Sequence, residues 1–145
     1  MLLDINYARI VHLEWELTLE ELLTERKSSV QLTSHKDCMV GVWLYSEGLS
    51  NYRHLEELPR LEKLHKDFHT QAQRVIDLHT SYQEKRAEEA FLKLKELSKD
   101  IIFLLTLIEL KILHRKQTID KFRHPIRALS NFFSGKSRTS SIIEG

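Results

Sequence analysis

Hydrophobic residues recur at steps of three and four along three long stretches of the chain, which is the period of an amphipathic helix. These stretches run from about Leu3 to Lys27, from Tyr52 or Pro59 to Tyr82, and from about Glu84 to Lys116. No stretch keeps the two-residue alternation of a half-buried β-strand. The pattern therefore predicts an all-α fold, an antiparallel four-helix bundle with one short helix, followed by a short C-terminal helix or tail.

The short helix is expected between the first two long ones. Ser34 is a suitable N-cap for a helix from His35 to about Tyr45, and Glu47 with Gly48 would end it. Pro59 fits the first turn of the next helix, where its missing N–H group is not needed. The residues just before that helix would then form a separate turn.

The last long helix is apolar nearly all round between Ile101 and Leu113. A helix of this kind has to be covered on more than one side. Either it lies fully buried at the centre of the bundle, or its outer face pairs with a second copy of the protein. Two-fold homodimers are common among soluble proteins, so we expect a homodimer.

The composition changes after Lys116, which predicts a bundle domain over residues 1–116 and a C-terminal segment over residues 117–145. In that segment basic residues outnumber acidic ones and are interspersed with apolar residues. The basic residues are Lys121, Arg123, Arg127, Lys136 and Arg138, and the apolar ones include Phe122, Ile126, Leu129, Phe132 and Phe133. The segment is either a basic amphipathic helix that docks on a partner, an acidic surface or a membrane, or a short packed helix with a disordered tail from Ser134.

Charge and length argue against several functions. The net charge of +1 gives no overall attraction to nucleic acid. The most apolar run, Ile101 to Ile108, is shorter than the roughly 20 residues of a transmembrane segment, and the N-terminus lacks the pattern of a secretory signal. The single cysteine cannot form an intrachain disulfide, which indicates a reducing compartment, and we expect a cytoplasmic protein.

Four residues of the kinds that bind zinc are spread over three predicted helices: His12, Cys38, His65 and His69. His65 and His69 stand four apart, so both rings project from one helix face and could share one ion. Each residue alone has a simpler explanation, because a lone buried histidine or cysteine more often belongs to the core. Together they offer one thiolate and three imidazoles, which favours zinc over magnesium or calcium and would complete a tetrahedral site.

Three neighbours could support such a site. Trp15 lies one turn after His12 and could wall it, Gly41 would let a neighbouring helix approach, and Trp43 would extend the apolar shell. Cys38 lies in the first turn of its predicted helix, where free amides would stabilise a thiolate. Asp37 and Asp67 are candidate hydrogen-bond partners of an imidazole. Surface or core positions are expected for the remaining histidines, His35, His54, His79, His114 and His124.

These residues stand in three short motifs: His12-Leu13-Glu14-Trp15, Cys38-Met39-Val40-Gly41-Val42-Trp43 and His65-Lys66-Asp67-Phe68-His69. They resemble the HxxW, CxxGxW and HxxxH signatures of the bacterial chemoreceptor zinc-binding (CZB) domain, in the family's order and with about its intervals. The resemblance covers about Asp4 to Gln83. It implies a four-helix domain that binds Zn²⁺ through His12, Cys38, His65 and His69.

Members of that family usually sit on chemoreceptors or diguanylate cyclases, often as dimers, and report zinc or oxidation of the zinc-bound cysteine to an output domain. These 145 residues contain neither a Gly-Gly-Asp/Glu-Glu-Phe signature nor a receptor coiled coil, so we expect a stand-alone regulatory sensor and not an enzyme. Its partner would be a signalling protein of chemoreceptor or diguanylate cyclase type, with chemotaxis or cyclic-di-GMP output. Two other functions stay open: a metal-free helical interaction module, and a di-iron or oxygen-binding bundle, which would need several inward carboxylates.

Overall fold

Helices make up nearly all the regular structure in the computed structural model, which describes residues 4–123. The elements are α1 (Ile5–Leu23), α2 (Met39–Trp43), a π-helical turn η1 (Leu44–Gly48), α3 (Leu49–Asn51), α4 (Glu57–Thr80) and α5 (Glu84–Arg123). No strand occurs within residues 4–123, and the predicted all-α fold is confirmed. None of the helices in this range is both long and apolar enough to cross a membrane. The chain divides into two compact units after Ile108.

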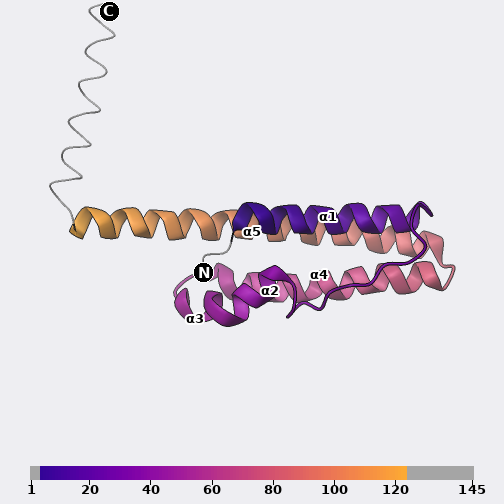
Figure 1. Ribbon diagram of the computed structural model, residues 1–145, viewed down its shortest axis with the longest axis horizontal. Coiled ribbons are helices and arrows are strands. Elements are labelled where there is room, and N and C mark those ends of the chain that lie inside the picture. Colours follow the sequence, from indigo (N-terminus) through magenta and orange to yellow (C-terminus); the bar gives the residue numbers. More distant parts are fainter. Residues whose placement is uncertain (1–3, 124–145) are drawn as a thin grey trace, which may run out of the picture. The chain divides into compact units, whose positions relative to one another are not determined.

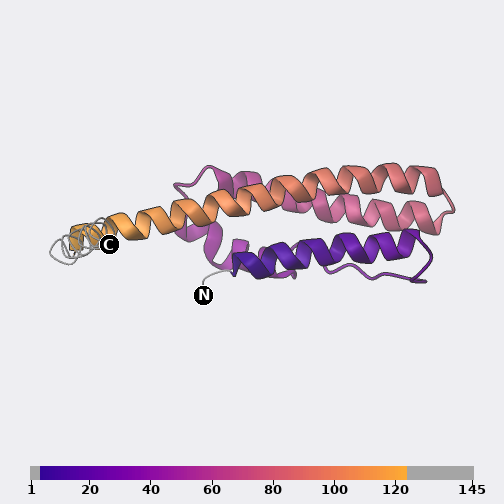
Figure 2. The same ribbon diagram turned by 90° about the horizontal axis from the view of Figure 1, so that it is seen from above.

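Three long helices pack together in the first unit: α1, α4 and the part of α5 up to Ile108 (Figures 1 and 2). α1 and α4 run in the same direction, and α5 runs the opposite way. α1 contacts α4 directly, and the Arg9 guanidinium joins it to α5 by donating to the Thr106 hydroxyl at 2.8 Å. Gln71 joins α4 to α5, because its amide donates to the Ala90 carbonyl at 2.8 Å.

The core lies where these helices face each other, and it is formed by apolar residues and histidines that recur at steps of three and four along α1 and α4. The buried ones are Ile5, Ala8, His12, Leu19 and Leu22 of α1 and Leu61, His65, Phe68, Ala72 and Val75 of α4. Five residues that recur at the same helical spacing are half-buried: Val11, Trp15, Leu64, Ile76 and His79. Each fully buried leucine or phenylalanine contributes about 1.5–3 kcal/mol to stability. The helical period therefore located the core faces correctly.

The short second helix begins four residues later than the sequence predicts, at Met39 and not at His35. The Ser34 hydroxyl caps only a turn, accepting two backbone N–H groups at 3.2 Å. Cys38 is the actual N-cap, and its sulfur accepts from the Gly41 amide at 3.5 Å. The prediction was wrong because a cysteine sulfur took the capping position normally filled by a hydroxyl or carboxylate oxygen.

The helical segment also continues past the predicted stop at Glu47 and Gly48. The π-helical turn η1 carries the chain through these residues into α3. A side chain at Gly48 would place its Cβ 2.9 Å from the Trp43 ring. The glycine therefore serves close packing against a tryptophan, which a helix-stop rule does not anticipate.

An extended segment, residues 24–38, connects α1 to α2 and runs back along the bundle (Figure 1). It makes the return that a full-length second helix would make in an up-down-up-down bundle. This explains why α1 and α4 point the same way. The segment also brings Cys38 next to His65 in the first half of α4.

Helix α5 extends to Arg123, beyond the predicted end at Lys116. Its apolar stretch is not fully buried: Leu105 is fully buried, but Phe103 is 61% exposed. The fully buried central helix is therefore excluded for the described residues, whereas pairing with a second copy stays a prediction. The domain boundary at residue 116 also stays a prediction, and residues 124–145 of the C-terminal segment lie outside the described range.

Candidate metal site

Cys38, His65 and His69 converge on one buried point between the start of α2 and α4. The Cys38 sulfur lies 2.9 Å from Nε2 of His65, which in turn lies 3.2 Å from Nε2 of His69. The ligand atoms of these buried residues all lie within 4.8 Å of one another. The two histidines share one face of α4, as their spacing predicts. The structure thus brings together three of the four predicted ligands.

His12 lies beside this group on α1 but is not a member of it. Its ring centroid is 5.8 Å from that of His65 and 5.0 Å from that of Phe68. Its Nδ1 lies 2.9 Å from the Ala8 carbonyl oxygen, and because that oxygen can only accept, Nδ1 carries the hydrogen. Nε2 is therefore the bare nitrogen with a lone pair available to a metal ion. A backbone contact of this kind commonly orients histidine ligands.

Burial sets the protonation of the whole group. It lowers the pKa of His65 to about 3 and of His69 to about 4, and it also lowers the pKa of His12. All three rings are consequently neutral near pH 7, as metal binding requires. Burial raises the pKa of the Cys38 thiol, and the amides at the start of α2 offset this only in part. The predicted amide stabilisation exists but does not prevail, so a metal would have to displace the thiol proton.

Without a cation, the Cys38 thiol and the rings of His65 and His69 cannot all form good hydrogen bonds with one another. Both the thiol and the His69 ring approach Nε2 of His65, which in its neutral acceptor form has one lone pair to share. Nδ1 of His65 has no hydrogen-bond partner among the described residues, whereas the His69 ring lies near the backbone of Thr33, which offsets part of the effect of burial on its pKa. One cation would engage the lone pairs of the sulfur and both Nε2 atoms together.

The donor set fits zinc. A thiolate with imidazoles and no carboxylate selects zinc over magnesium or calcium, and it is not the carboxylate-rich set of a di-iron bundle. Tetrahedral zinc, with bonds of about 2.3 Å to sulfur and about 2.0 Å to nitrogen, separates its ligand atoms by roughly 3.3 to 3.5 Å. The observed 2.9 and 3.2 Å separations are slightly shorter. Zinc binding would therefore require a rearrangement of the three ligand atoms, which lie within 4.8 Å of one another.

Gly41 positions Cys38, although its neighbour is not the predicted one. A Cβ at Gly41 would overlap the carbonyl oxygen of His35 and lie 2.9 Å from its carbonyl carbon. The close approach is confirmed, but it is made by the turn before α2 and not by a helix. Trp43 is buried with its ring 6.3 Å from that of Tyr52.

The other predicted neighbours of the site have different roles. Asp37 accepts from the Ser34 hydroxyl at 2.7 Å, and Asp67 pairs with Lys63 at 2.8 Å. Trp15 lines a surface cleft between α1 and the extended segment. His35, for which the sequence allows an approach to the metal but favours a position on the solvent face, is half-buried with its ring 6.3 Å from that of His69. Only its distance of three residues from Cys38 hinted at this position.

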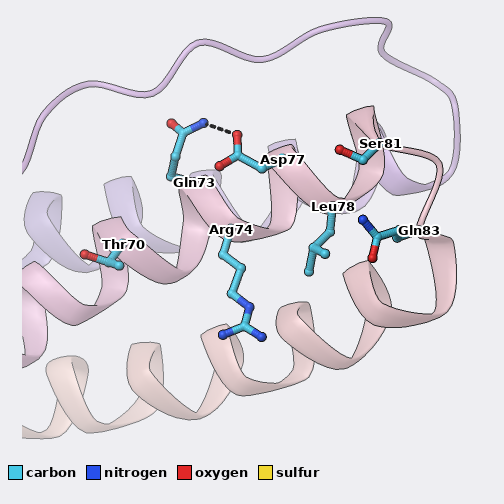
Figure 3. Close-up of a pocket in the computed structure, with 7 residues that line it drawn as sticks. All are labelled: Thr70, Gln73, Arg74, Asp77, Leu78, Ser81 and Gln83. Carbon is cyan, nitrogen blue, oxygen red and sulfur yellow. Dashed lines mark hydrogen bonds between the residues drawn. The ribbon is translucent and has the colours of Figure 1, made fainter.

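A second cleft lies near the connection between α4 and α5 (Figure 3). It is lined by Thr70, Gln73, Arg74, Asp77, Leu78, Ser81 and Gln83. Gln73 donates to Asp77 across its rim at 2.8 Å. The cleft contains neither histidine nor cysteine, and Arg74 and Asp77 are exposed. It therefore offers nothing comparable to the buried thiol–imidazole group.

A helical bundle with a buried group of one thiol and two imidazoles defines a metal-binding domain. The family model of the chemoreceptor zinc-binding domain matches residues 12–76, a little under half of the chain. The predicted resemblance to this family is confirmed over that segment, which contains His12, Cys38, His65 and His69. Zinc is the metal that both the family and the donor set indicate. No curated protein and no solved structure matches the chain.

The metal-free protein is expected to lose stability as the pH falls from about 6.5 toward 3. Unfolded histidines bind protons near pH 6.5, whereas the folded pKa values are about 3 for His65 and about 4 for His69. Between these pH values the unfolded state therefore binds more protons than the folded state does. The free energy of unfolding consequently decreases as the pH is lowered. Urea unfolding with a chelator at several pH values measures this. A His65→Gln/His69→Gln variant should show a flatter profile, and an equally steep one would contradict the assignment.

Proposed function

We propose that this chain is a zinc-binding sensor in which His12 joins Cys38, His65 and His69 as the fourth ligand. The convergence of the Cys38 sulfur and the two Nε2 atoms of α4 carries this proposal. The bare Nε2 of His12 on the neighbouring helix supports the fourth assignment. Four protein ligands would leave no open position on tetrahedral zinc, so the proposed role is regulatory and not catalytic.

The ligands come from α1, α4 and the N-cap of α2, so zinc would hold three elements together. Helix α2 has only five residues, and Cys38 is its N-terminal anchor. Loss of zinc, or oxidation of the Cys38 sulfur, would release α2 and the turn before it while the long helices stay packed. Zinc availability and oxidation are thus both candidate signals for the same switch.

A homodimer is proposed through the outer face of α1 and α5. Ile10, Leu13 and Leu17 of α1 are 50%, 47% and 59% exposed, and Phe103 of α5 is 61% exposed. The contact of Arg9 with α5 shows that these two helices are neighbours. Exposed apolar residues on adjacent helices are typical of a surface between subunits.

The output of the switch is proposed to pass to a signalling protein of chemoreceptor or diguanylate cyclase type. The name of the matched family supports the chemoreceptor type, and the diguanylate cyclase type rests on the resemblance of the three motifs. A cytoplasmic location is proposed because the Cys38 thiol has to stay reduced to bind zinc. The proposed bundle domain, residues 1–116, contains all four ligands.

Metal analysis of the full chain purified without added metal tests the proposed function. We expect one zinc per chain, and the cobalt-substituted protein should show the strong absorption of a tetrahedral site with a thiolate ligand. His12→Gln should weaken zinc binding and change the cobalt spectrum. An unchanged spectrum would remove His12 from the ligand set. If the purified protein carries no metal and a strong chelator leaves its melting unchanged, the chain is a metal-free interaction module instead.

A further inference from the structure

The buried face of α5 follows a seven-residue repeat. When Ala87 is counted as position d, every a and d position from Ala87 to Ile108 is buried, including Leu94, Ile101 and Leu105. This spacing places one continuous stripe along a helix and is the pattern by which helices pack side by side. Within the first unit, the stripe faces the other helices of the bundle.

The same repeat continues in the second unit, residues 109–123, at Ile112, Arg115, Ile119 and Phe122. We call these four positions the α5 seam. Here burial is lost toward the end of the helix: Ile112 is half-buried, Ile119 is 38% exposed and Phe122 is 85% exposed. An exposed stripe in the register of a packed stripe is a docking surface for another helix.

Charge argues against a second copy of the chain as the occupant of this seam. In a parallel pair, Arg115 would meet its own counterpart at a d position, and Lys111 at g would face Lys116 at e of the other chain. Residues 109–123 contain five lysine or arginine residues and two acidic ones, a formal charge of +3. Pairing in either direction would therefore bring together two segments of like charge.

We propose that the α5 seam binds an acidic amphipathic helix of a different protein. That helix would present apolar residues to Ile112, Ile119 and Phe122 and a carboxylate to Arg115, with further acidic residues flanking its apolar stripe. The basic character of residues 109–123 would then favour association and select against basic partners. The inference concerns the partner of the proposed sensor and does not rest on its zinc ligands.

Two designed helical peptides test the seam on the full-length protein. Both carry leucine and isoleucine at a and d; one has glutamate at e and g with an aspartate to meet Arg115, and the other has lysine throughout. We expect the acidic peptide to bind at least about tenfold more tightly in titration calorimetry. The reason is that its carboxylates would form several charge pairs with the basic seam, whereas the lysine peptide would be repelled by it. Ile119→Ser and Phe122→Ser should each weaken that binding, because both remove apolar seam area.

Matched variants identify the seam as the binding surface. Leu113→Ser alters an apolar side chain that is 49% exposed on another face of the same segment, and it should leave peptide binding unchanged. Lys116→Glu combined with Arg123→Glu should shift the preference toward the lysine peptide. Zinc content should equal that of the unaltered protein in every variant, so failure of the seam and failure of the zinc site are distinguishable.

Three results would overturn the proposal. The first is equal binding of the two peptides, or equal loss in Leu113→Ser and Ile119→Ser. The second is a sedimentation experiment in which the unaltered protein has the mass of an oligomer and only the seam variants have the mass of a monomer. The occupant of the seam would then be a second copy of the chain. The third is seam-dependent binding of phosphatidylglycerol vesicles without binding of the acidic peptide, which would make the partner a membrane.

Discussion

Replacing Cys38 with alanine is expected to lower zinc affinity by about a hundredfold or more and to leave the three long helices formed. Structural zinc sites contribute roughly 10–16 kcal/mol through four ligands, so one ligand accounts for about 3 kcal/mol. Cys38 supplies the only sulfur of the group, 2.9 Å from Nε2 of His65. A competition titration with a chromophoric chelator measures the affinity, and circular dichroism measures the helix content.

Cys38→Ser is the informative companion to the alanine variant. A serine hydroxyl can still cap α2 by accepting from the Gly41 amide, but it is a poor ligand for zinc. If ligation is the role of Cys38, both variants lose zinc to a similar extent. If capping is its main role, serine restores most of the affinity that alanine loses. Unchanged zinc content in both variants would remove Cys38 from the ligand set.

Gly41→Ala is expected to reduce zinc affinity strongly without touching a ligand. The new Cβ would overlap the His35 carbonyl oxygen, a backbone atom that cannot rotate away. Either the turn before α2 or α2 itself then has to shift, and Cys38 shifts with it. We expect a loss of about tenfold or more, since misplacing a group that supports ligands costs roughly 10–100-fold in affinity.

Two other substitutions in the same helical segment serve as controls for Gly41→Ala. Val42 is 55% exposed, so Val42→Ala should change neither zinc affinity nor melting. Gly48→Ala meets the Trp43 ring at 2.9 Å, a side chain that can move, so its main effect should be on stability. If Gly41→Ala binds zinc as well as Val42→Ala does, the turn does not position Cys38.

The long helices were predictable because their determinants are local. The apolar residues of α1 and α4 recur with the helical period, and the side chains they place inward, such as Leu19 and Phe68, are buried as expected. The short second helix was less predictable. Its start depends on a cysteine cap, and its continuation depends on Gly48 fitting against Trp43. These contacts depend on which particular side chains meet. Helix propensities are averages over many proteins and contain no information about such pairs.

The α5 seam also combines a feature that the sequence predicts with one that only the folded chain shows. Its seven-residue register could have been read from the sequence, because it depends only on spacing along one helix. What spacing cannot say is which part of the stripe other elements cover. Burial at Ile108 and exposure at Phe122 are properties of the folded chain.

The sequence by itself determined the donor set, one thiol and its histidines, and the placement of His65 and His69 on one face. These follow from residue identity and from the helical repeat, which act over a few residues. Only the tertiary structure decided that Cys38 meets these two rings, that the His12 ring lies 5.8 Å from that of His65, and that the partner of Gly41 is the turn before α2. Such contacts depend on how separate elements pack, and side-chain shape and backbone approach settle that packing across long distances in the chain.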